Sequence, residues 1–317
     1  MMRLGVKCTY PSSTLGSANV YAREVAKSIL TMTPGSVLLS SNNWPDLPST
    51  VPVFRLGLPL DPHTLLRRPW APLSNTFSCA TLAARARLEV IYCPFVHEAF
   101  PYLLSTPQVV TVHDVVPLIW PRDFRASNAL WRLFYMRATA AAAAIITVSE
   151  ASKEDIVKYC QVDEARVTVV HNGFTPPAQS YVASTAAEPY ILYVSSSHYP
   201  YKNIRRLLEA YSLLRYRIPH RLCIVGRRAP RFRRALSESV HALSLSDRVD
   251  FEQDLPSEVL ASRYQNAAAF VYPSLYEGFG IPPLEAIGRK FSAVLALRQP
   301  VSNFPFQTVH AVFRHTA

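Results

Sequence analysis

Two glutamates separated by seven residues flank a glycine-containing loop in the C-terminal half of the chain. Glu277 opens the run Glu-Gly-Phe-Gly after an apolar strand pattern that ends at Pro273, and Glu285 lies in the helix pattern that starts near Pro282. Glycine lets backbone N–H groups approach a ligand closely, and a helix N-terminus carries partial positive charge. The segment predicts an anion site at the carboxyl edge of a parallel sheet. The alternative, left open by the residue types, is that the glycines only form the turn and Glu285 only complements the helix dipole.

Two basic residues follow other strand patterns in the same half. Lys202 stands beside Asn203 at a predicted helix start, where a lysine opposes the helix dipole, so its placement favours a functional cation. Arg227 follows Gly226 and the apolar run 221–225. It is a candidate second cation for an anionic ligand, with a solvated surface arginine as the alternative.

The N-terminal half offers two further candidates. Gly16 lies in a Ser/Gly loop between a predicted strand (4–9) and a predicted helix (18–30), and an ordinary flexible loop is the alternative. His113 follows the buried apolar run 109–112. A histidine in such a place is either a structural residue with its hydrogen bonds satisfied or an active-site group.

Short apolar strand patterns alternate with helix patterns along most of the chain, which predicts an α/β fold with parallel sheets covered on both faces. A proline-containing stretch rich in Ser, Thr and Ala predicts a linker over residues 176–189. We therefore expect two Rossmann-like domains, over residues 1–175 and 190–290. Residues 291–317 contain no Asp or Glu and show no clean period, so we expect a divergent tail and consider an incomplete second domain.

Composition limits the classes of protein that remain. The chain has 317 residues, which favours about two domains, and 49% of them are hydrophobic, which excludes a disordered or fibrous chain. The 33 basic and 22 acidic residues give a net charge of +11, which suits a polyanion, a phosphate-bearing substrate or an anionic membrane surface. Five dispersed cysteines without a C-x-x-C pair argue against a disulfide framework and a zinc site.

Targeting signals are also informative. Lys7 interrupts what would be the apolar core of a signal peptide, and no apolar run reaches 18 residues. We therefore expect a cytoplasmic protein, with contact at the inner face of an anionic membrane as the one membrane association considered.

Six segments resemble, in order and spacing, motifs of retaining GT-B glycosyltransferases of the family 4 (group 1) type. The resemblance runs from about residue 4 to residue 290. It implies two Rossmann-like domains that face a cleft, with the acceptor bound from the first and the nucleotide sugar mainly by the second. The segments are Thr111–Asp114 with Pro117 and Pro121, Thr147–Glu150, His171–Gly173, Tyr190–Val194, Lys202-Asn203, and the E-x7-E stretch Glu277–Ala286.

The resemblance implies roles for residues of the second domain. Glu285 maps onto the glutamate that accepts hydrogen bonds from both ribose hydroxyls, and Glu277 maps onto the glutamate facing the hydroxyls of the donor sugar. The amides of Gly278, Phe279 and Gly280 lie where the sugar or the phosphates would be held.

The remaining assignments concern charge and the first domain. Lys202 maps onto the residue that neutralises the diphosphate, Gly16 onto a loop that approaches it, and His113 onto the active-site histidine near the donor sugar. Many relatives carry an arginine where this chain reads Ser195–His198. With one cation fewer, His198 or Arg227 is the candidate replacement.

The function that the resemblance implies is transfer of a hexose (mannosyl, glucosyl or rhamnosyl type) from a nucleoside-diphosphate sugar to a hydroxyl of a glycan or lipid-linked acceptor, with retention. A front-face mechanism is implied, in which the leaving phosphate oxygen helps take the acceptor's proton. We expect no metal and no cofactor beyond the donor, since no D-x-D follows a strand pattern.

Two alternatives remain. A basic nucleic-acid-binding protein would explain the charge, but the arginines are dispersed and no recognised module is present, so no specific nucleic acid is expected. A catalytically impaired, truncated remnant would explain why Gly288 is followed by Arg289-Lys290-Phe291 where relatives continue with Pro-Val.

Overall fold

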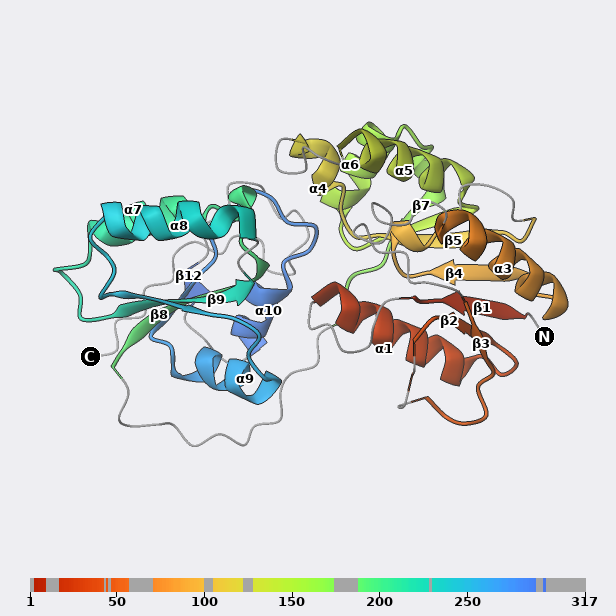
Figure 1. Cartoon of the computed structure of the whole chain (residues 1–317), viewed down its shortest axis with the longest axis horizontal. Coiled ribbons are helices and arrows are strands. Elements are labelled where there is room, and N and C mark those ends of the chain that lie inside the picture. Colours follow the sequence, from red (N-terminus) through yellow and green to blue (C-terminus); the bar gives the residue numbers. More distant parts are fainter. Residues whose placement is uncertain are drawn as a thin grey trace. The chain divides into compact units, whose positions relative to one another are not determined.

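The computed structural model describes residues 3–9, 17–42, 44, 47–56, 71–99, 105–121, 128–173, 188–227, 230–288 and 293–294. The chain divides into two compact units, Met1–His171 and Asn172–Ala317, and each is described by itself (Figure 1). The predicted linker (176–189) falls mostly outside the described residues, as does the tail apart from residues 293–294.

The first unit is built on a seven-stranded sheet in the order β3-β2-β1-β4-β5-β6-β7, and every pair of neighbours is parallel. The order reverses between β1 and β4. Loops at the carboxyl ends of strands diverge at such a point, which is where open α/β sheets bind ligands. The strands are β1 (Leu4–Lys7), β2 (Val37–Ser40), β3 (Val53–Arg55), β4 (Val90–Cys93), β5 (Gln108–Val112), β6 (Ala144–Thr147) and β7 (Val167–Val169).

Helices cover both faces of this sheet. Helix α1 lies on one face and α3, α5 and α6 on the other, with short helical turns between them (Figure 1). Ser149 begins α6 as predicted, since its hydroxyl accepts a hydrogen bond from the Ser152 N–H at 3.1 Å. The bounds are α1 (Ser17–Met32), α3 (Ala71–Arg85), η1 (Val96–Glu98), α4 (Val116–Ile119), α5 (Asn128–Ala141), α6 (Glu150–Cys160) and η3 (Glu164–Arg166).

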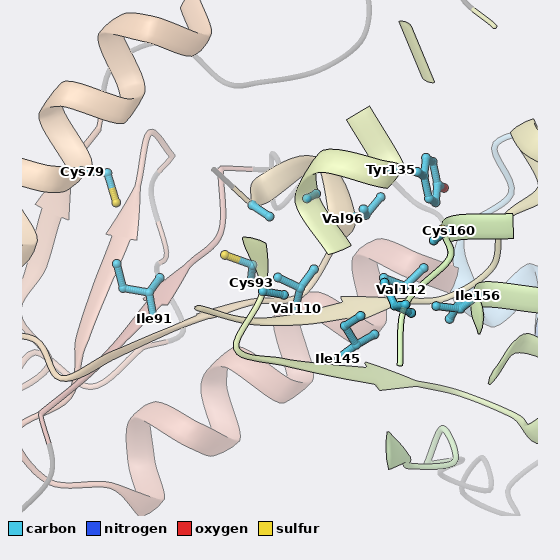
Figure 2. Close-up of a cluster of buried hydrophobic side chains, with 14 of the residues drawn as sticks. Cys79, Ile91, Cys93, Val96, Val110, Val112, Tyr135, Ile145, Ile156 and Cys160 are labelled. Atoms are coloured by element: carbon cyan, nitrogen blue, oxygen red, sulfur yellow. The ribbon is translucent and has the colours of Figure 1, made fainter. Parts of the chain in front are cut away.

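Alternating side chains of the strands fill two cores. In β4, Ile91 and Cys93 pack with α3, α5 and α6, whereas Tyr92 between them packs with α1. Figure 2 shows the first of these cores, in which Val110 and Ile145 of neighbouring strands lie together. The period of two places each second residue on the same face, so both faces must be covered, as the continuous apolar runs predict.

The second unit carries a five-stranded parallel sheet in the order β10-β9-β8-β11-β12, with a reversal between β8 and β11. Helices α7 and α8 lie on one face and α9 and α10 on the other (Figure 1). The elements are β8 (Tyr190–Ser197), η4 (Pro200–Lys202), α7 (Ile204–Ser212), β9 (Arg221–Arg227), α8 (Pro230–Ala242), β10 (Val249–Glu252), α9 (Ser257–Asn266), β11 (Ala269–Val271), α10 (Ile281–Gly288) and β12 (Ala293–Val294).

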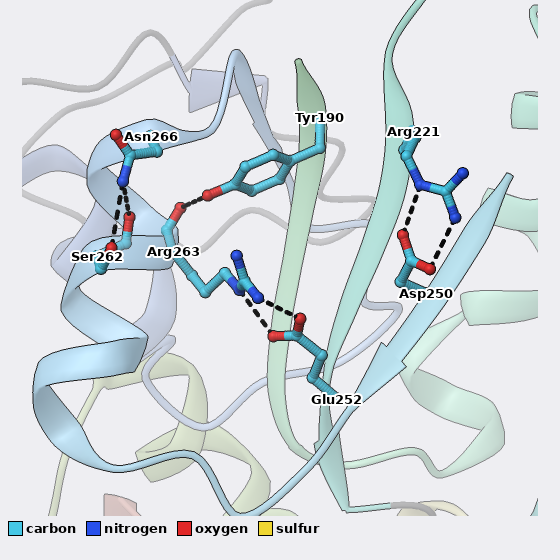
Figure 3. Close-up of polar contacts among 7 residues, drawn as sticks. All are labelled: Tyr190, Arg221, Asp250, Glu252, Ser262, Arg263 and Asn266. Carbon is cyan, nitrogen blue, oxygen red and sulfur yellow. Dashed lines mark hydrogen bonds and ion pairs between the residues drawn. The ribbon is translucent and has the colours of Figure 1, made fainter. Parts of the chain in front are cut away.

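Polar contacts fasten α9 to this sheet (Figure 3). Arg263 of α9 donates two hydrogen bonds to Glu252 of β10, at 2.8 and 2.6 Å, and the Tyr190 hydroxyl of β8 donates to the Arg263 carbonyl at 2.8 Å. At the sheet edge, Arg221 pairs with Asp250 and lowers the pKa of that carboxyl. Paired fork-to-carboxylate contacts fix both distance and orientation.

One helix is shorter than its pattern predicts. The apolar period favours a helix over 204–216, but α7 ends at Ser212. The Ser212 hydroxyl bonds the Glu209 carbonyl at 2.7 Å, and the next backbone bonds, from Leu213 and Leu214, reach back three residues instead of four. A side chain that competes for a backbone carbonyl favours this tightening of the last turn.

Gly226 lies where β9 comes very close to β8. Its φ is +145°, and a Cβ added there would lie 2.0 Å from the Ser195 carbonyl oxygen and 2.8 Å from His198 Nε2. Such a backbone conformation and such a gap admit only glycine.

We expect Gly226→Ala to destabilise the second unit by about 3 kcal/mol or more, because the methyl group must displace backbone. Gly173→Ala is the matched control, since nothing lies within 4 Å of a Cβ at Gly173, and its effect should stay within about 1 kcal/mol. Urea unfolding followed by far-UV circular dichroism measures both. Equal stability of the two variants would contradict the close approach.

Candidate functional site

An ion pair links the two loops at the reversal point of the second sheet. Lys202 Nζ lies 2.7 Å from Glu277 Oε1 and 2.8 Å from Oε2, and the side chains are 8% and 11% exposed. Lys202 ends η4 after β8, and Glu277 follows β11, which is the neighbour of β8. The structure thus brings together two residues that the sequence assigned separately to the donor site.

Two hydrogen bonds hold these loops together beside the ion pair. The Leu275 N–H donates to the Tyr201 carbonyl at 2.8 Å, and Asn203 Nδ2 donates to the Pro273 carbonyl at 3.0 Å. Asn203 has a φ of +60°, in the left-handed region that asparagine tolerates better than most residues. The asparagine therefore turns the chain from η4 into α7 and also ties this turn to the neighbouring loop.

Two buried tyrosines lie close to Glu277. The rings of Tyr193 and Tyr272 stack with centroids 6.0 Å apart. Burial, together with the nearby Glu277 carboxylate, holds the pKa of Tyr272 well above its ordinary value and also raises the pKa of Tyr193. Both hydroxyls therefore stay protonated at neutral pH. Lys202 Nζ in turn lies 5.2 Å from the centre of the Tyr201 ring, a cation–π distance.

Glu285 is oriented by a residue that the sequence analysis missed. The hydroxyl of Tyr264, on α9, donates to Glu285 Oε2 at 2.8 Å, and the tyrosine side chain is fully buried. Glu285 itself lies on α10, so the contact crosses between two helices. An aromatic residue within a helix pattern is indistinguishable from an ordinary core residue in the sequence, so no signal singled out Tyr264.

The loop between the two glutamates has the predicted backbone freedom at one position. Gly280 is buried and has a φ of +85°, which a residue with a side chain adopts only with strain. Gly278 and Phe279 are half-buried. The loop enters α10 directly after Gly280, so the helix N-terminus follows the glutamate and glycine segment as predicted.

His113 lies at the end of β5 in the first unit, held on three sides. Its Nε2 is 3.0 Å from the Pro94 carbonyl, and Tyr21 packs edge-on at a centroid distance of 4.6 Å. The Ser152 hydroxyl donates to the His113 carbonyl at 3.1 Å. A carbonyl oxygen only accepts, so the neutral ring carries its proton on Nε2 and can accept a hydrogen bond at Nδ1. Burial lowers the pKa of His113 to about 4.

A hydroxyl network lies beside this histidine. The Tyr92 and Thr111 hydroxyls are 2.8 Å apart, and the Tyr21 hydroxyl lies 3.1 Å from Tyr92 and 3.3 Å from Thr111. Asp114, next to His113, accepts the Val116 N–H at 3.0 Å and so supports the start of α4.

The remaining residues that the sequence suggested for the donor site are Gly16, Arg227 and His198. Gly16 lies outside the described residues, and Arg227 ends β9 with a side chain that is not described. His198 is buried, with ring centroids 6.3 Å from both Tyr193 and Phe251. It therefore packs against aromatic rings within the second unit, and its role as a substitute cation stays a prediction.

The described part of the chain contains no group of three or more His, Cys, Asp or Glu side chains that could hold a metal ion. No helix within it is long and apolar enough to cross a membrane.

Two parallel sheets covered by helices, the second with Lys202 and Glu277 at its reversal point, define a protein of the GT-B glycosyltransferase fold. Sucrose-phosphate synthase from Thermosynechococcus elongatus superposes with a TM-score of 0.70 at 17% identity, covering 93% of this chain and 81% of that one. HepE from Anabaena, solved with UDP-glucose, gives a TM-score of 0.67 at 17% identity, with 93% and 80% covered.

The chain belongs to glycosyltransferase family 4, whose model matches residues 18–176, half of the chain. A second model, described as glycosyl transferases group 1, matches residues 181–296. These matches confirm the family resemblance drawn from the motifs.

Several curated relatives are mannosyltransferases by name. The O-antigen chain mannosyltransferase RfbU of Salmonella typhimurium is 30% identical over 200 residues, which is 63% of this chain and 54% of the relative. O-antigen chain mannosyltransferase B of Escherichia coli is 30% identical over 202 residues, or 56% of this chain and 50% of the relative. The chain thus spans about half the length of the curated relatives it matches.

The low pKa of His113 predicts a pH-dependent stability of the first unit. A folded-state pKa of about 4 against an ordinary 6.5 means that burial of the neutral ring stabilises the fold above pH 6.5, and that this contribution is lost as the pH falls toward 4. Relative to His113→Gln, which does not titrate at this position, the wild type should lose about 2 to 3 kcal/mol of unfolding free energy between pH 8 and pH 4.5.

Urea unfolding followed by tryptophan fluorescence reports on this unit, because all four tryptophans (Trp44, Trp70, Trp120 and Trp131) precede residue 172. Parallel pH profiles for the two proteins would show that His113 is not buried as a neutral ring.

Proposed function

We propose that this protein transfers a mannosyl or related hexosyl group from a nucleoside-diphosphate sugar to a hydroxyl of a glycan or lipid-linked acceptor, with retention at the anomeric carbon. The observation that carries the proposal is the Lys202–Glu277 ion pair at the reversal point of the second sheet, next to a loop that leads into the helix bearing Glu285. The names of the relatives favour mannose as the sugar.

Lys202 can bind the diphosphate without leaving Glu277. An ammonium group has three protons, and the two oxygens of Glu277 accept at 2.7 and 2.8 Å. The third proton can reach a phosphate oxygen while the carboxylate stays next to the attached sugar. Since the leaving diphosphate gains negative charge in the transition state, a fixed ammonium stabilises that state more than the bound donor.

Glu285 and His113 are the proposed hydrogen-bond acceptors for hydroxyls of the donor. Glu285 accepts hydrogen bonds from the ribose hydroxyls, and Tyr264 fixes the carboxylate for this contact at 2.8 Å. His113, neutral with its proton on Nε2, presents Nδ1 as an acceptor for a hydroxyl of the transferred sugar. The backbone amides of Gly278, Phe279 and Gly280 would complete the phosphate and sugar contacts.

The chemistry needs no further group in this proposal. The leaving phosphate oxygen takes the proton of the acceptor hydroxyl on the same face of the sugar, so neither a metal ion nor a carboxylate base is required. The net charge of +11 favours a cytoplasmic enzyme that contacts the anionic inner face of a membrane, where a lipid-linked acceptor is presented.

Transfer from a panel of nucleoside-diphosphate hexoses to a lipid-linked glycan, with the product's anomeric configuration read by NMR, tests the proposal. Retained configuration with turnover supports it. Donor binding without turnover favours the impaired-enzyme alternative, and the absence of both contradicts the proposed function. Tight, sequence-selective DNA binding at physiological salt would favour the nucleic-acid alternative instead.

The two glutamates should differ in their effect on nucleotide binding. Glu285→Ala removes two charge-assisted hydrogen bonds to the ribose and should weaken the binding of the bare nucleoside diphosphate by about 100-fold. Glu277→Ala should weaken that affinity less than Glu285→Ala does, because Glu277 faces the sugar that this ligand lacks.

Isothermal titration calorimetry measures both affinities. Tyr264→Phe keeps the Glu285 carboxylate but removes its 2.8 Å contact, and should give an intermediate loss. Glu238→Ala, an exposed position on α8, is the control. If the Glu285 variant binds like the wild type, its assignment to the ribose is wrong.

A further inference from the structure

A lysine and a glutamate of the first unit form an ion pair that is closed to solvent. Lys7 ends β1 and Glu98 ends η1; Nζ lies 3.0 Å from Oε2, and both side chains are 0% exposed. Lys7 Nζ also donates to the Glu98 carbonyl. Ionised groups persist in an apolar interior only when their charges and protons are matched by neighbours. The pair therefore depends on the elements that surround it.

Thr9 supplies further contacts to the same carboxylate. Its backbone N–H and its hydroxyl donate to Glu98 Oε1 at 2.7 and 2.6 Å. The carboxylate thus receives two donors on one oxygen and the Lys7 ammonium on the other, all at the short distances of charge-assisted bonds. Through it, the end of β1 is joined to the turn after β4, across the reversal point of the first sheet.

The turn that Glu98 anchors is the turn that supports His113. Pro94, the first residue of the turn, accepts the Nε2 hydrogen bond of His113 at 3.0 Å. Phe95 packs with its ring centroid 5.4 Å from the imidazole. Three residues separate Pro94 from Glu98 in the chain. A displacement of Glu98 would therefore also displace the Pro94 carbonyl, which fixes the His113 ring.

We propose that Glu98, held by Lys7 and Thr9, is a positioning residue for His113. It keeps the Pro94 carbonyl where it accepts from Nε2–H, so that Nδ1 remains the acceptor for the sugar. Without that carbonyl in place, the neutral ring distributes its proton between both nitrogens and loses its fixed orientation. The inference rests on the sugar-binding role proposed for His113.

The double variant Lys7→Met/Glu98→Leu tests it by removing both charges at similar volume, a change that buried ion pairs often tolerate. We expect a folded protein with kcat at least about tenfold lower and a donor KM within about threefold, because misplacement affects the reacting geometry more than binding. In nitrogen NMR of ¹⁵N-histidine-labelled protein, the single Nε2–H tautomer of His113 should become a mixture. The signal is assigned with His113→Gln.

Glu98→Asp serves as the second variant should the double variant fail to fold, since it keeps the charge but withdraws the carboxylate by one methylene. Arg234→Gln/Glu238→Gln, which removes an exposed ion pair of α8, is the control and should behave like the wild type. A folded Glu98 variant with wild-type kcat and an unchanged His113 tautomer overturns the proposal. If the wild type binds no donor, the proposed function is contradicted instead. The His113 tautomer still tests the positioning role of Glu98 in that case.

Discussion

Reversal of the strand order is the constraint on which both units depend. Only at that point do the loops of two neighbouring parallel strands diverge and leave room between them at the carboxyl edge. Each unit spans its own reversal with a lysine and a glutamate. Lys7 ends β1 and meets Glu98 beyond β4, and Lys202 follows β8 and meets Glu277 beyond β11. The same topological problem, joining two divergent loops, therefore has the same electrostatic solution in each unit.

Burial separates the roles of these two pairs. Lys7 and Glu98 are fully closed, with the second carboxylate oxygen taken by Thr9, so the pair can only hold protein segments together. Lys202 and Glu277 retain exposures of 8% and 11%, and the proposed function has a phosphate oxygen approach the ammonium there. A partly open pair is desolvated less when it forms and is perturbed more by a charged ligand. In the proposed function, this difference in exposure, more than residue type, separates the pair that binds the donor from the pair that supports the fold.

The sequence was sufficient for the parts of this structure that follow from local pattern. Apolar runs placed most strands, Ser149 placed the start of α6, and the glutamates with their glycines placed the loop before α10. Contacts between distant segments could not be predicted in this way. Lys7 and Glu98 are 91 residues apart, and in the sequence Lys7 was informative only as a charge that interrupts an apolar run. Tyr264 was missed because its partner on α10 is set by helix packing.

Contacts internal to the second unit order the loops that we propose to bind the donor. The Asn203 and Leu275 hydrogen bonds and the Lys202–Glu277 ion pair join the η4 segment to the loop after β11 at three points. Ordering two such loops at the moment of binding would take free energy from the interaction with the ligand. Because these contacts lie within the second unit, the two loops become ordered when that unit folds. Substitutions that loosen Asn203 should therefore weaken donor binding through the entropy of the loops, even though its side chain is directed at a protein carbonyl and not at the ligand.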